Sequence, residues 1–513
     1  MSVDQASALL TAIDVTIIFL ITLTLVTQKL TVFIASKPIY NVYFHPLSKF
    51  PGPKGWAATP LPYVSAFVRG SSQQKVLEFH QKYGKVVRLG RDELSFQTPE
   101  AWNEIMGHRK GQKENPKDPL HHGNAPHNIV SAGREFHATI RRILSHGFSA
   151  QNVIKQQPLM ISSIRLFIQR LYEQTAGFSH EDCPPVEMTS WLNFVSFDVM
   201  GDLAFGETFG CLERSEYHPW IKLIHANAKR ATYLLAAGRI PILVPVLRVL
   251  FRKQLVQAEY DLNNFVRQKV DQRIRLSSAR PDLAESLIKA MDRHIIDREA
   301  VYENSKVLLA AGSETTATAL MGAVYLIAAN QVARERLNTE IRAAFEAEEQ
   351  IDIKTTANLK YLAAVIEESL RLYPPSPHAS TRITPPGGQT ILGRWVPENT
   401  ILGLWQWAIY HNDSMFHEPF EFRPERWLND PKFQSDCKDA FRPFHTGPRS
   451  CLGVNLANAL IRVILARIIW SFDLGLPPEG RDWLQREDHK IFIGYTKPLL
   501  FLRLTPRQPA RVE

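Results

Sequence analysis

The chain contains few cysteines. Four occur among its 513 residues, they are widely spaced, and no two form a CxxC pair: Cys183, Cys211, Cys437 and Cys451. This pattern argues against a disulfide scaffold and against a zinc site built from paired cysteines, and it favours a reducing compartment. Low-complexity tracts are also missing, and a hydrophobic content of 45% with 22% charged residues is ordinary for a folded protein with a large core.

The sequence also lacks a long run of lysine and arginine. Its net charge of +9 is modest for this length, so nucleic-acid binding is not expected. The positive charge could instead favour an anionic membrane surface or an acidic protein partner. The length allows more than one domain, although a single large enzyme domain is also possible.

The N-terminal residues 1–35 are predicted to be a membrane anchor. Leu9–Val26 is apolar, and with extension to Ile34 the segment approaches the roughly 20 residues that cross a bilayer as a helix. A cleaved signal peptide is the alternative, but no small-residue cleavage site is obvious and the positive n-region is absent. Lysines that follow the segment, such as Lys29 and Lys37, predict that the rest of the chain lies in the cytosol.

Residues 36–55 are predicted to be a proline-rich hinge, and residues 56–513 a catalytic domain. Pro51 and Pro53, together with Gly52 and Gly55, prevent a helix from continuing out of the membrane through this segment.

The most informative stretch is FHTGPRSCLG, from Phe444 to Gly453. A cysteine thiolate can bind iron, two glycines allow the backbone to pass close to a flat cofactor, and an arginine can hold an anionic group on that cofactor. The alternative is a buried structural cysteine in a turn, which is common for an isolated cysteine.

The positions of Phe444, Gly447, Arg449, Cys451 and Gly453 resemble the haem-binding signature of the cytochrome P-450 family at every defining position. The resemblance implies a mainly α-helical fold with a smaller β-rich subdomain, preceded by one N-terminal transmembrane helix. It also implies haem (heme b) as cofactor, with Cys451 as the axial thiolate ligand of the iron and the other four residues around the cofactor.

A second motif lies in the apolar stretch Val307–Ala329, for which Asp297 is a suitable helix N-cap. Glu314 near its middle argues against a transmembrane helix, because a carboxylate at the bilayer centre costs about 2.5 to 3.5 kcal/mol. A long helix through a protein core therefore fits better. A buried carboxylate is also costly, which makes Glu314 a functional candidate.

The residues around Glu314 resemble the oxygen-activation motif of the family. By this resemblance, Gly312 lets the helix approach the haem and open locally, while Glu314 and Thr315 form an acid–alcohol pair that relays protons through water. The alternative is a threonine that bonds back to a helix carbonyl, which leaves the adjacent glutamate unexplained.

Gly133–Ser149 is predicted to be one amphipathic helix on which His137 and Arg141 project together. It resembles the family helix that donates a tryptophan and an arginine to a haem propionate, with His137 at the tryptophan position. Arg382 matches another position that pairs with a propionate. Two solvated side chains on a basic helix are the alternative for His137 and Arg141.

The last motif combines a helix predicted for Thr356–Tyr373 with the segment FRPERW. Glu-x-x-Arg alone is a weak signal, but together these segments resemble the family's buried triad of Glu368, Arg371 and Arg426. Such a triad is structural, since its charge-assisted hydrogen bonds would lock the helix to the segment before the cysteine. A final helix, Leu452–Phe472, would point its positive end at the sulfur.

Other segments give coarser predictions. A helix is expected over Lys75–Tyr83, and β-type runs over Val86–Phe96 and Gly393–Tyr410 are expected to share a small sheet. Arg239–Phe251 is too short and broken to span a bilayer, so it is either buried or dips into the membrane surface. The histidines of the loop 117–130 are not expected to bind a metal.

The resemblance is strongest to filamentous-fungal members that act on secondary metabolites, including trichothecene-type hydroxylases. It implies a monooxygenase on the endoplasmic reticulum membrane that uses O2 and an apolar terpenoid, polyketide or alkaloid. NADPH and flavins would act only through a separate NADPH-cytochrome P-450 reductase, because the chain leaves no room for their domains. A haem-thiolate isomerase or dehydratase, an oxidative ring-coupling enzyme, and a haem-binding sensor or helical scaffold are the alternatives.

Overall fold

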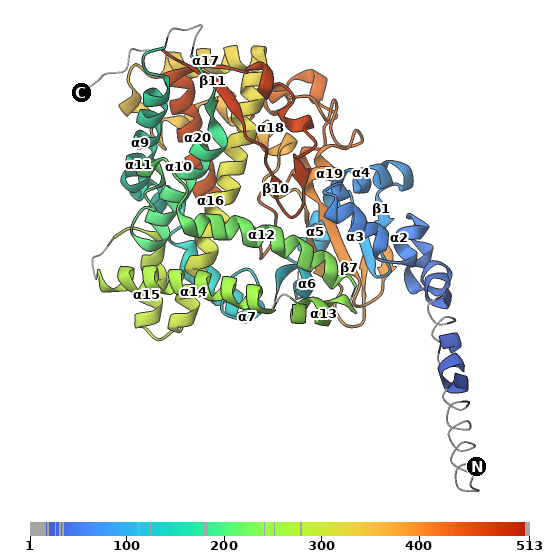
Figure 1. The fold of residues 1–513 in the computed structure, drawn as a ribbon. Helices are drawn as coiled ribbons and strands as arrows, with labels where there is room; N and C mark the ends of the chain where they lie inside the picture. The colour runs from blue at the N-terminus through green and yellow to red at the C-terminus, as the bar shows by residue number, and fades with distance from the viewer. Residues whose placement is uncertain are drawn as a thin grey trace, which may run out of the picture.

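The computed structural model describes residues 35–507, except 110, 112, 124, 179–182, 241, 251 and 277–279, together with 17, 20–25, 27–29 and 32. Most of the described chain is helical, and the strands gather mainly in a smaller part on the right of Figure 1. This agrees with the expected mainly α fold with a smaller β-rich subdomain.

Two long helices form the centre of the helical part. The helix α16 (Arg298–Ala329) packs along α10 (Met188–Phe205), and both are apolar around most of their circumference. A helix that is apolar all round must be covered on all sides, and α9, α18 and α20 help to do this. The helices of eight or more residues around these two are α3 Leu61–Val68, α4 Ser72–Tyr83, α5 Pro99–Met106, α7 Arg134–Ser145, α9 Gln157–Thr175, α12 Pro219–Gly238, α13 Leu243–Leu250, α14 Arg252–Arg275, α15 Leu283–Asp292, α17 Gln331–Ala344, α18 Lys360–Leu372 and α20 Val454–Ser471.

The larger sheet joins strands from both halves of the chain. Its order is β1-β2-β7-β4, in which β2 and β7 run parallel and the other pairs antiparallel. The second sheet has the order β3-β11-β8, and two hairpins, β5/β6 and β9/β10, complete the strands. Their bounds are β1 Val86–Arg88, β2 Glu93–Phe96, β3 Val186–Glu187, β4 Ala379–Ile383, β5 Gln389–Ile391, β6 Arg394–Val396, β7 Ile401–Trp405, β8 Phe472–Gly475, β9 Lys490–Ile491, β10 Tyr495–Thr496 and β11 Phe501–Pro506.

The buried apolar residues form one large and one small core. The large core fills the space between the helices, and the small one lies where α3 and α4 cover the larger sheet, with Trp56, Phe67 and Trp405 among its members. The sheet is therefore attached to the helical part through a core of its own.

Several predicted elements are confirmed. Asp297 caps α16 by accepting a hydrogen bond from the Ala300 N–H at 2.8 Å. The predicted common sheet is confirmed for β1, β2 and β7, which join through the β2/β7 pair, whereas β6 at the start of the run 393–410 pairs with β5 in a separate hairpin. Within the part of the chain that the structure describes, α16 and α20 are the helices long and apolar enough to cross a membrane. Because 67% of the apolar window of each is buried in the protein, both are core helices, as expected for Val307–Ala329.

Two predicted boundaries are wrong. The predicted helix Gly133–Ser149 ends as α7 at Ser145, and the Ser149 hydroxyl accepts from the Asn152 N–H to start a new helix, α8 (Ala150–Lys155). The predicted β-type run to Tyr410 ends with β7, and Gln406–Tyr410 forms the short helix α19 instead. Serine is a better N-cap than helix-interior residue, and short apolar runs fit a buried helix as well as a strand.

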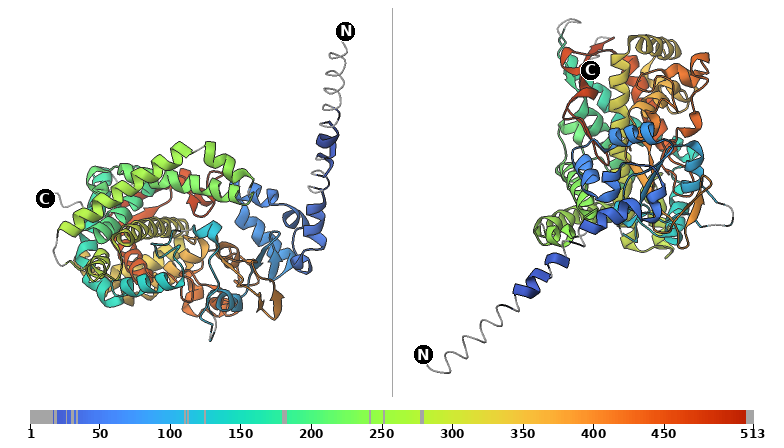
Figure 2. Two further views of the ribbon diagram at one scale, coloured as in Figure 1. Left: turned by 90° about the horizontal axis from the view of Figure 1, so that it is seen from below. Right: turned by 90° about the vertical axis from the view of Figure 1, so that its right-hand side faces the viewer.

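The proline-rich segment lies against the sheet. The Arg88 N–H donates to the Pro51 carbonyl at 2.7 Å, and a Cβ on Gly52 would overlap the Arg88 carbonyl oxygen. Residues 35–43 are helical, so a helix extends into the predicted hinge 36–55 and ends before the 3-10 helix η1 (Pro46–Lys49). Much of the predicted anchor lies outside the described residues. Its described residues 20–25 are helical and exposed, in a segment that projects from the body in Figure 2.

Candidate active site

A cavity of about 330 Å³ lies between α16 and the loop that leads into α20. Its lining combines Cys451 and its neighbours on one side with Ala311 and Thr315 of α16 on the other. The motif around Cys451 and the motif around Thr315 are more than 130 residues apart in the sequence, and the fold brings both to one cavity.

The loop before α20 is held in a fixed register by its own backbone. The Cys451 N–H donates to the Phe444 carbonyl at 2.8 Å, and the Ser450 N–H donates to the Gly447 carbonyl at 3.1 Å. Gly447 has a φ of +79°, which other residues rarely adopt, and a Cβ there would overlap the Met106 carbonyl oxygen. Only glycine therefore fits this position without moving the backbone of the neighbouring segment.

Cys451 lies just before α20 and lines the cavity, from which its side chain is accessible. Burial raises the pKa of its thiol, while the Gly453 N–H and the Arg141 guanidinium act in the opposite direction. The helix N-terminus that begins at Val454 adds a positive end beside the sulfur. These donors are of the kind that stabilises a thiolate when a metal replaces the thiol proton.

Basic side chains surround the part of the cavity near this loop. Arg141 donates to the carbonyl and the hydroxyl of Ser450 at 2.7 and 3.0 Å. Arg449 donates to the Ala132 carbonyl at 2.9 Å and pairs with Glu114, also at 2.9 Å. The fold therefore ties both arginines to the wall of the cavity.

Arg382 and Lys117 add two more positive charges. They lie on facing segments joined by an isolated β-bridge, and Lys117 lines the cavity. Burial, together with the neighbouring Arg382 and Arg449, lowers the pKa of Lys117 to about 7. Burial and Arg449 lower the pKa of Arg382 to about 10.

Glu114 is the carboxylate that opposes Lys117, Arg382 and Arg449. One carboxylate among four cations leaves this region positive, and the neighbouring cations add to the effect of burial in lowering the pKa values of Lys117 and Arg382. A ligand that brings carboxylates to the wall would offset this positive charge. The residues present therefore fit haem, which carries two carboxylates and whose iron accepts a thiolate.

His137 also lines the cavity, where its side chain is buried. Its pKa is lowered to about 4, mainly by burial and then by Arg449. The ring is therefore neutral near pH 7 and can donate one hydrogen bond to a group in the cavity. The solvated position that was the alternative for His137 is wrong.

On the opposite wall, α16 is a continuous helix through Gly312. The Thr315 hydroxyl donates to the Ala311 carbonyl at 2.6 Å and faces the cavity. A Cβ on Gly312 would lie 2.5 Å from the end of the Met200 side chain of α10. Gly312 thus allows close packing of α10 on α16, and the local opening predicted at this glycine is not present.

Glu314 points to a different neighbour. Its carboxylate forms an ion pair with Lys497 at 2.5 Å, and it is absent from the residues that line the cavity. Lys497 also donates to the Thr318 hydroxyl at 2.9 Å. The structure therefore places Glu314 and Thr315 side by side on α16 but directs their side chains to different surroundings.

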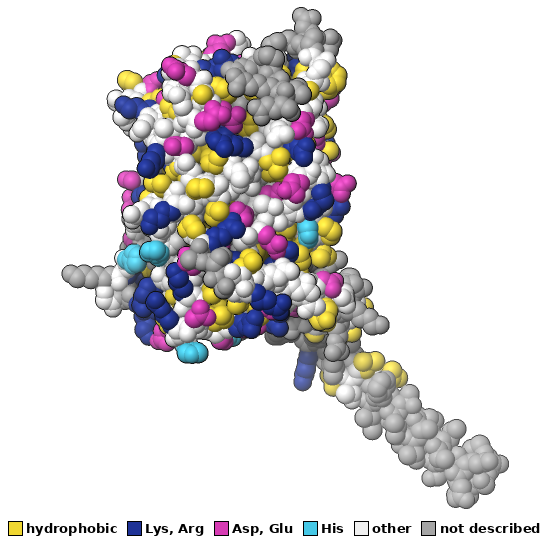
Figure 3. All heavy atoms as spheres, turned by 90° about the vertical axis from the view of Figure 1, so that its left-hand side faces the viewer, with side chains coloured by type: hydrophobic (Ala, Val, Ile, Leu, Met, Phe, Trp, Pro, Cys, Tyr) yellow, Lys and Arg dark blue, Asp and Glu magenta, His cyan; other side chains and the backbone are white. Residues whose placement is uncertain are grey.

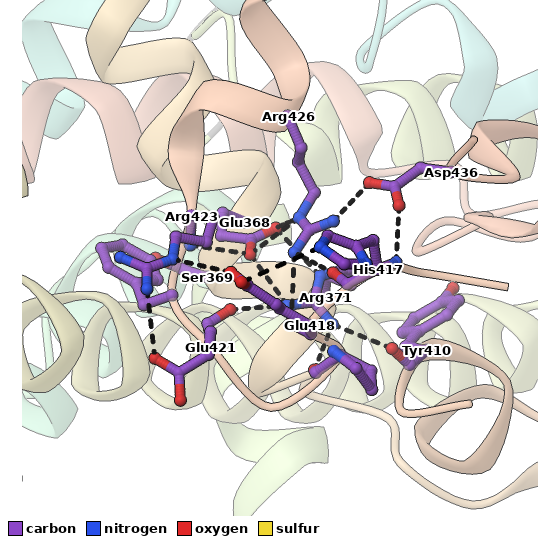
Figure 4. Close-up of polar contacts among 12 residues, drawn as sticks. Glu368, Ser369, Arg371, Tyr410, His417, Glu418, Glu421, Arg423, Arg426 and Asp436 are labelled. Carbon is purple, nitrogen blue, oxygen red and sulfur yellow. Dashed lines mark hydrogen bonds and ion pairs between the residues drawn. The ribbon is translucent and has the colours of Figure 1, made fainter. Parts of the chain in front are cut away.

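The three residues of the predicted triad meet in the core (Figure 4). Glu368, Arg371 and Arg426 are fully buried, and the carboxylate accepts from both guanidinium groups at 2.8 to 3.0 Å. Arg371 also donates to the carbonyls of Tyr410 and Pro419. Arg426 pairs further with Asp436. The network thus ties α18 to the segment that precedes the cysteine loop.

The rest of the cavity wall is largely apolar. Ile129 and Val130 from the loop before α7, Val307 and Leu308 from α16, and Pro375 after α18 belong to it. Such a wall favours an apolar small molecule.

Sequence reasoning missed Lys117, Glu114 and Lys497. No local pattern distinguishes them, because each acquires its role from residues distant in the chain. Glu314 and Lys497, for example, are 183 residues apart. The nearest available signal was the position of Lys117 at the start of the loop 117–130.

Comparisons with known proteins agree with this geometry. The family model described as cytochrome P-450 matches residues 51–502. The chain is 38% identical to the trichothecene C-15 hydroxylase of Fusarium sporotrichioides, covering 91% of this chain and 95% of that protein. It is 39% identical to the cytochrome P-450 monooxygenase astA of Talaromyces wortmannii, covering 93% and 95%. It is also 38% identical to the averantin hydroxylase of Dothistroma septosporum, covering 91% and 88%.

Proposed function

The chain belongs to the cytochrome P-450 family of monooxygenases, and from this premise we propose that it hydroxylates an apolar fungal secondary metabolite at a haem held by Cys451. The observation that carries the proposal is the single cavity lined by Cys451 on one wall and Thr315 on the other. A metal ligand and a hydroxyl on opposite walls are the arrangement that oxygen insertion requires.

The residues of the positive wall would hold the cofactor. Arg141, Arg382, Arg449 and Lys117 provide the cations for its carboxylates, and the neutral His137 provides a further donor. When bound, haem supplies activation of O2 at an iron whose electron density is raised by the thiolate. The buried triad of Glu368, Arg371 and Arg426 keeps the cysteine loop in place.

Thr315 and Glu314 would transfer protons into the cavity. Cleavage of the O–O bond of O2 consumes protons, so a hydroxyl on the cavity wall must pass them inward. The Thr315 hydroxyl can rotate from the Ala311 carbonyl to accept and donate hydrogen bonds within the cavity. Glu314, the next residue on the helix, is the acid from which these protons come.

The substrate is proposed to be a terpenoid, polyketide or alkaloid. Two observations support this class: the apolar wall formed by residues such as Ile129 and Leu308, and the names of the relatives, which include a trichothecene and an averantin hydroxylase. Hydroxylation is the reaction that both names state.

The proposal also includes the source of the electrons and the cellular location of the protein. A separate NADPH-cytochrome P-450 reductase would deliver the electrons, and residues 1–35 would anchor the chain in the endoplasmic reticulum membrane with its catalytic domain in the cytosol. The apolar stretch Leu9–Val26 and the exposed apolar side chains among residues 20–25 support the anchor.

The Cys451→Ala variant tests the assignment of the iron ligand. The reduced carbon monoxide complex of the wild-type protein should give the absorption band of thiolate-ligated haem, and the variant should lose it. Cys437→Ala is the matched control, because this half-buried thiol is not among the cavity residues. A wild-type protein that folds and binds haem but lacks the band would refute the proposal.

Metabolite profiling of the source organism with the same variant tests the substrate. An apolar precursor should accumulate, and the purified wild-type enzyme should hydroxylate it only when NADPH and the reductase are both present. Conversion of that precursor without NADPH would instead identify an isomerase or dehydratase.

A further inference from the structure

The segment 127–132 lies just before α7 and contributes Ile129 and Val130 to the apolar wall of the cavity. It is neither helix nor strand, so regular secondary structure does not satisfy its backbone N–H and C=O groups. Buried backbone groups of this kind need partners from side chains or from other loops. The partners therefore decide where Ile129 and Val130 lie.

One side chain of α16 satisfies two of these backbone groups. The Asn304 amide nitrogen donates to the His127 carbonyl at 2.8 Å, and the Ile129 N–H donates to the Asn304 amide oxygen at 2.9 Å. The amide nitrogen also donates to the Ala300 carbonyl, one turn earlier on α16, at 2.7 Å. With two carbonyls at one end and an N–H at the other, only this orientation of the amide makes all three bonds.

Asn304 is fully buried and lies one turn before the cavity on α16. Val307 and Leu308, three and four positions further along the helix, line the cavity. Side chains at these spacings share one face of a helix. The face of α16 that forms the apolar wall therefore also holds the segment 127–132, which is 175 residues away in the sequence.

Two other contacts between this segment and α16 are weaker. The His127 ring lies 3.6 Å from the Asp297 carboxylate, with 41% and 59% of the two side chains exposed, and an exposed pair of this kind contributes little. Asn128 donates to the Glu303 carboxylate at 3.4 Å, which is long for a hydrogen bond. Asn304 therefore makes the short, buried bonds that hold the segment to α16.

The segment is held on its other side by cations of the positive wall. Lys117 donates to the Val130 carbonyl, and Arg449 donates to the Ala132 carbonyl at 2.9 Å. Both cations are assigned above to the carboxylates of the cofactor. The bonds of Asn304, in contrast, involve no residue of that wall, so Asn304 can be changed without changing the cofactor-binding cations.

We propose that Asn304 is a positioning residue for substrate selection: its amide fixes the segment 127–132 against α16 and thereby sets where Ile129 and Val130 meet the substrate. This inference rests on the proposed function, which assigns the cavity to an apolar substrate.

Asn304→Ser is the informative variant. A serine hydroxyl in a helix bonds to the carbonyl four residues earlier, so the bond to Ala300 is kept and both bonds to the segment are lost. The His127 carbonyl and the Ile129 N–H are then left without partners, which favours a shift of the segment toward water. Ile129 and Val130 move with it, and the cavity opens at this end.

Hydrogen–deuterium exchange of the holoenzyme measures this shift directly. Asn304→Ser should raise the exchange rate of the amides of residues 128–131 several-fold. The matched control is Ser305→Ala at the next position of α16, because Ser305 is also fully buried and its hydroxyl has no hydrogen-bond partner in the described part of the chain. Unchanged exchange in Asn304→Ser would overturn the proposal.

Carbon monoxide serves as the probe of the cavity, since it reaches the iron without an organic substrate. After photolysis of the reduced complex, Asn304→Ser should rebind carbon monoxide several-fold faster than wild type and keep the thiolate-haem band. Ser305→Ala should rebind at the wild-type rate. Faster exchange in Asn304→Ser without any change in rebinding would show that the segment does not control the cavity, and the proposal would be wrong.

A double-mutant cycle distinguishes positioning from general damage. In a chain with Ile129→Ala and Val130→Ala, Asn304→Ser should add little to the rebinding rate, because the side chains that it positions are already gone. A further rise as large as in the wild-type background would count against the proposal.

A second variant covers the case in which Asn304→Ser fails to fold. Asn304→Asp keeps an acceptor for the Ile129 N–H but removes the amide donor to the His127 carbonyl. It should raise the exchange of residues 128–131 in the same direction, and wild-type exchange in this variant would refute the role of Asn304.

The outcomes also separate this inference from the proposed function. If the folded wild-type protein lacks the thiolate-haem band, the proposed function fails, while the exchange experiment still tests the bonds of Asn304. If the band is present and Asn304→Ser behaves as wild type, only the role of Asn304 is wrong.

Discussion

At the scale of single residues, Glu367 and Glu368 are neighbours in opposite environments. Glu368 accepts hydrogen bonds from Arg371, Arg426 and the Trp427 indole. Burial acts to raise the pKa of its carboxyl, but the two guanidinium groups and the Arg423 N–H hold that pKa below the ordinary value of 4.5. Burial raises the pKa of the Glu367 carboxyl above that value. The two carboxylates therefore affect stability with opposite signs.

Glu368→Gln should lower the free energy of unfolding at neutral pH by ~3 kcal/mol, because it leaves the buried Arg371 guanidinium without its charged partner, while Arg426 keeps only Asp436. The stabilisation from Glu368 is present above pH 4.5 and is lost as the pH falls through its lowered pKa. Urea denaturation at neutral and acidic pH should show a difference between wild type and variant that shrinks with acidification.

Glu367→Gln is the matched control and should act in the opposite sense. A carboxyl with a raised pKa favours folding at low pH and loses that contribution as the pH rises through the raised value. The variant should therefore be as stable as wild type at neutral pH or more stable. Equal destabilisation by both substitutions would contradict the assignment of the ion pairs to Glu368 alone.

The lowered pKa of Lys117 leads to a prediction about how firmly the protein retains haem. The pKa of about 7 reflects burial beside Arg382 and Arg449, so the lysine is partly neutral above that pH in the absence of an anion. Binding of the haem carboxylates would favour its charged form, and binding above pH 7 would therefore take up a proton. Haem affinity should fall as the pH rises above 7, by at most about tenfold per pH unit.

This pH dependence can be measured as the rate of haem transfer to excess apomyoglobin on both sides of pH 7. Lys117→Met should transfer haem faster and with a flatter pH dependence than wild type. Lys113→Met, at an exposed lysine in the same segment, should behave as wild type. An unchanged pH dependence in Lys117→Met would exclude Lys117 from the haem-binding wall.

The residues of the site differ in how far the sequence could reveal them. Cys451, Arg449 and Gly447 lie in one contiguous motif, so a local pattern identified them. Lys117 and Lys497 contribute only through contacts between distant segments. The direction of Glu314 was also beyond the sequence, since a helical pattern gives the angle between neighbouring side chains but not what lies on each side.

At the scale of elements, the same limit appears at helix ends. Asp297 identified the start of α16 because an N-cap bonds to residues three positions away. The end of α7 depends on Ser149, whose side chain starts α8 rather than continuing the first helix. The helical periodicity of the apolar residues does not tell whether a serine such as Ser149 lies inside one helix or caps the start of the next.

A prediction about the cysteine loop comes from comparing its Gly447 with Gly393, a glycine outside the loop. Gly447 and Gly393 both have positive φ angles, +79° and +71°, but only Gly447 would bring a Cβ into the backbone of a neighbouring segment. Gly393→Ala should cost about 1 kcal/mol of stability from the φ angle alone. Gly447→Ala should add a displacement of the loop from Met106 and should therefore lose haem.

The comparison needs two measurements, the haem content per polypeptide and the midpoint of thermal unfolding. Gly393→Ala should keep full haem content with a small decrease in the midpoint. Gly447→Ala should lose most of its haem. Retention of haem and of the thiolate band in Gly447→Ala would show that the loop tolerates movement at this position.

At the scale of the whole molecule, charge and apolar surface are distributed differently. Lysine and arginine are interspersed with acidic residues over most of the face shown in Figure 3, so the net positive charge is not gathered there into one stripe. Exposed apolar side chains concentrate instead on α13 and just before it, where Ile242 and Val249 are 77% and 78% exposed. In Figures 1 and 2, α13 lies on the side of the body from which the N-terminal helix projects.

This concentration predicts membrane binding that does not depend on the anchor. A chain that lacks residues 1–35 should still sediment with phosphatidylcholine vesicles, because α13 can bury its exposed valines and leucines in the bilayer surface. Burial of one such side chain contributes about 1.5 to 3 kcal/mol, so Val249→Asp in the truncated chain should reduce binding more than tenfold. The matched control is Val332→Asp, since Val332 is 65% exposed on α17 and should not contact the membrane. Equal loss of binding in both variants, or no binding by the truncated chain, would mean that α13 does not face the bilayer.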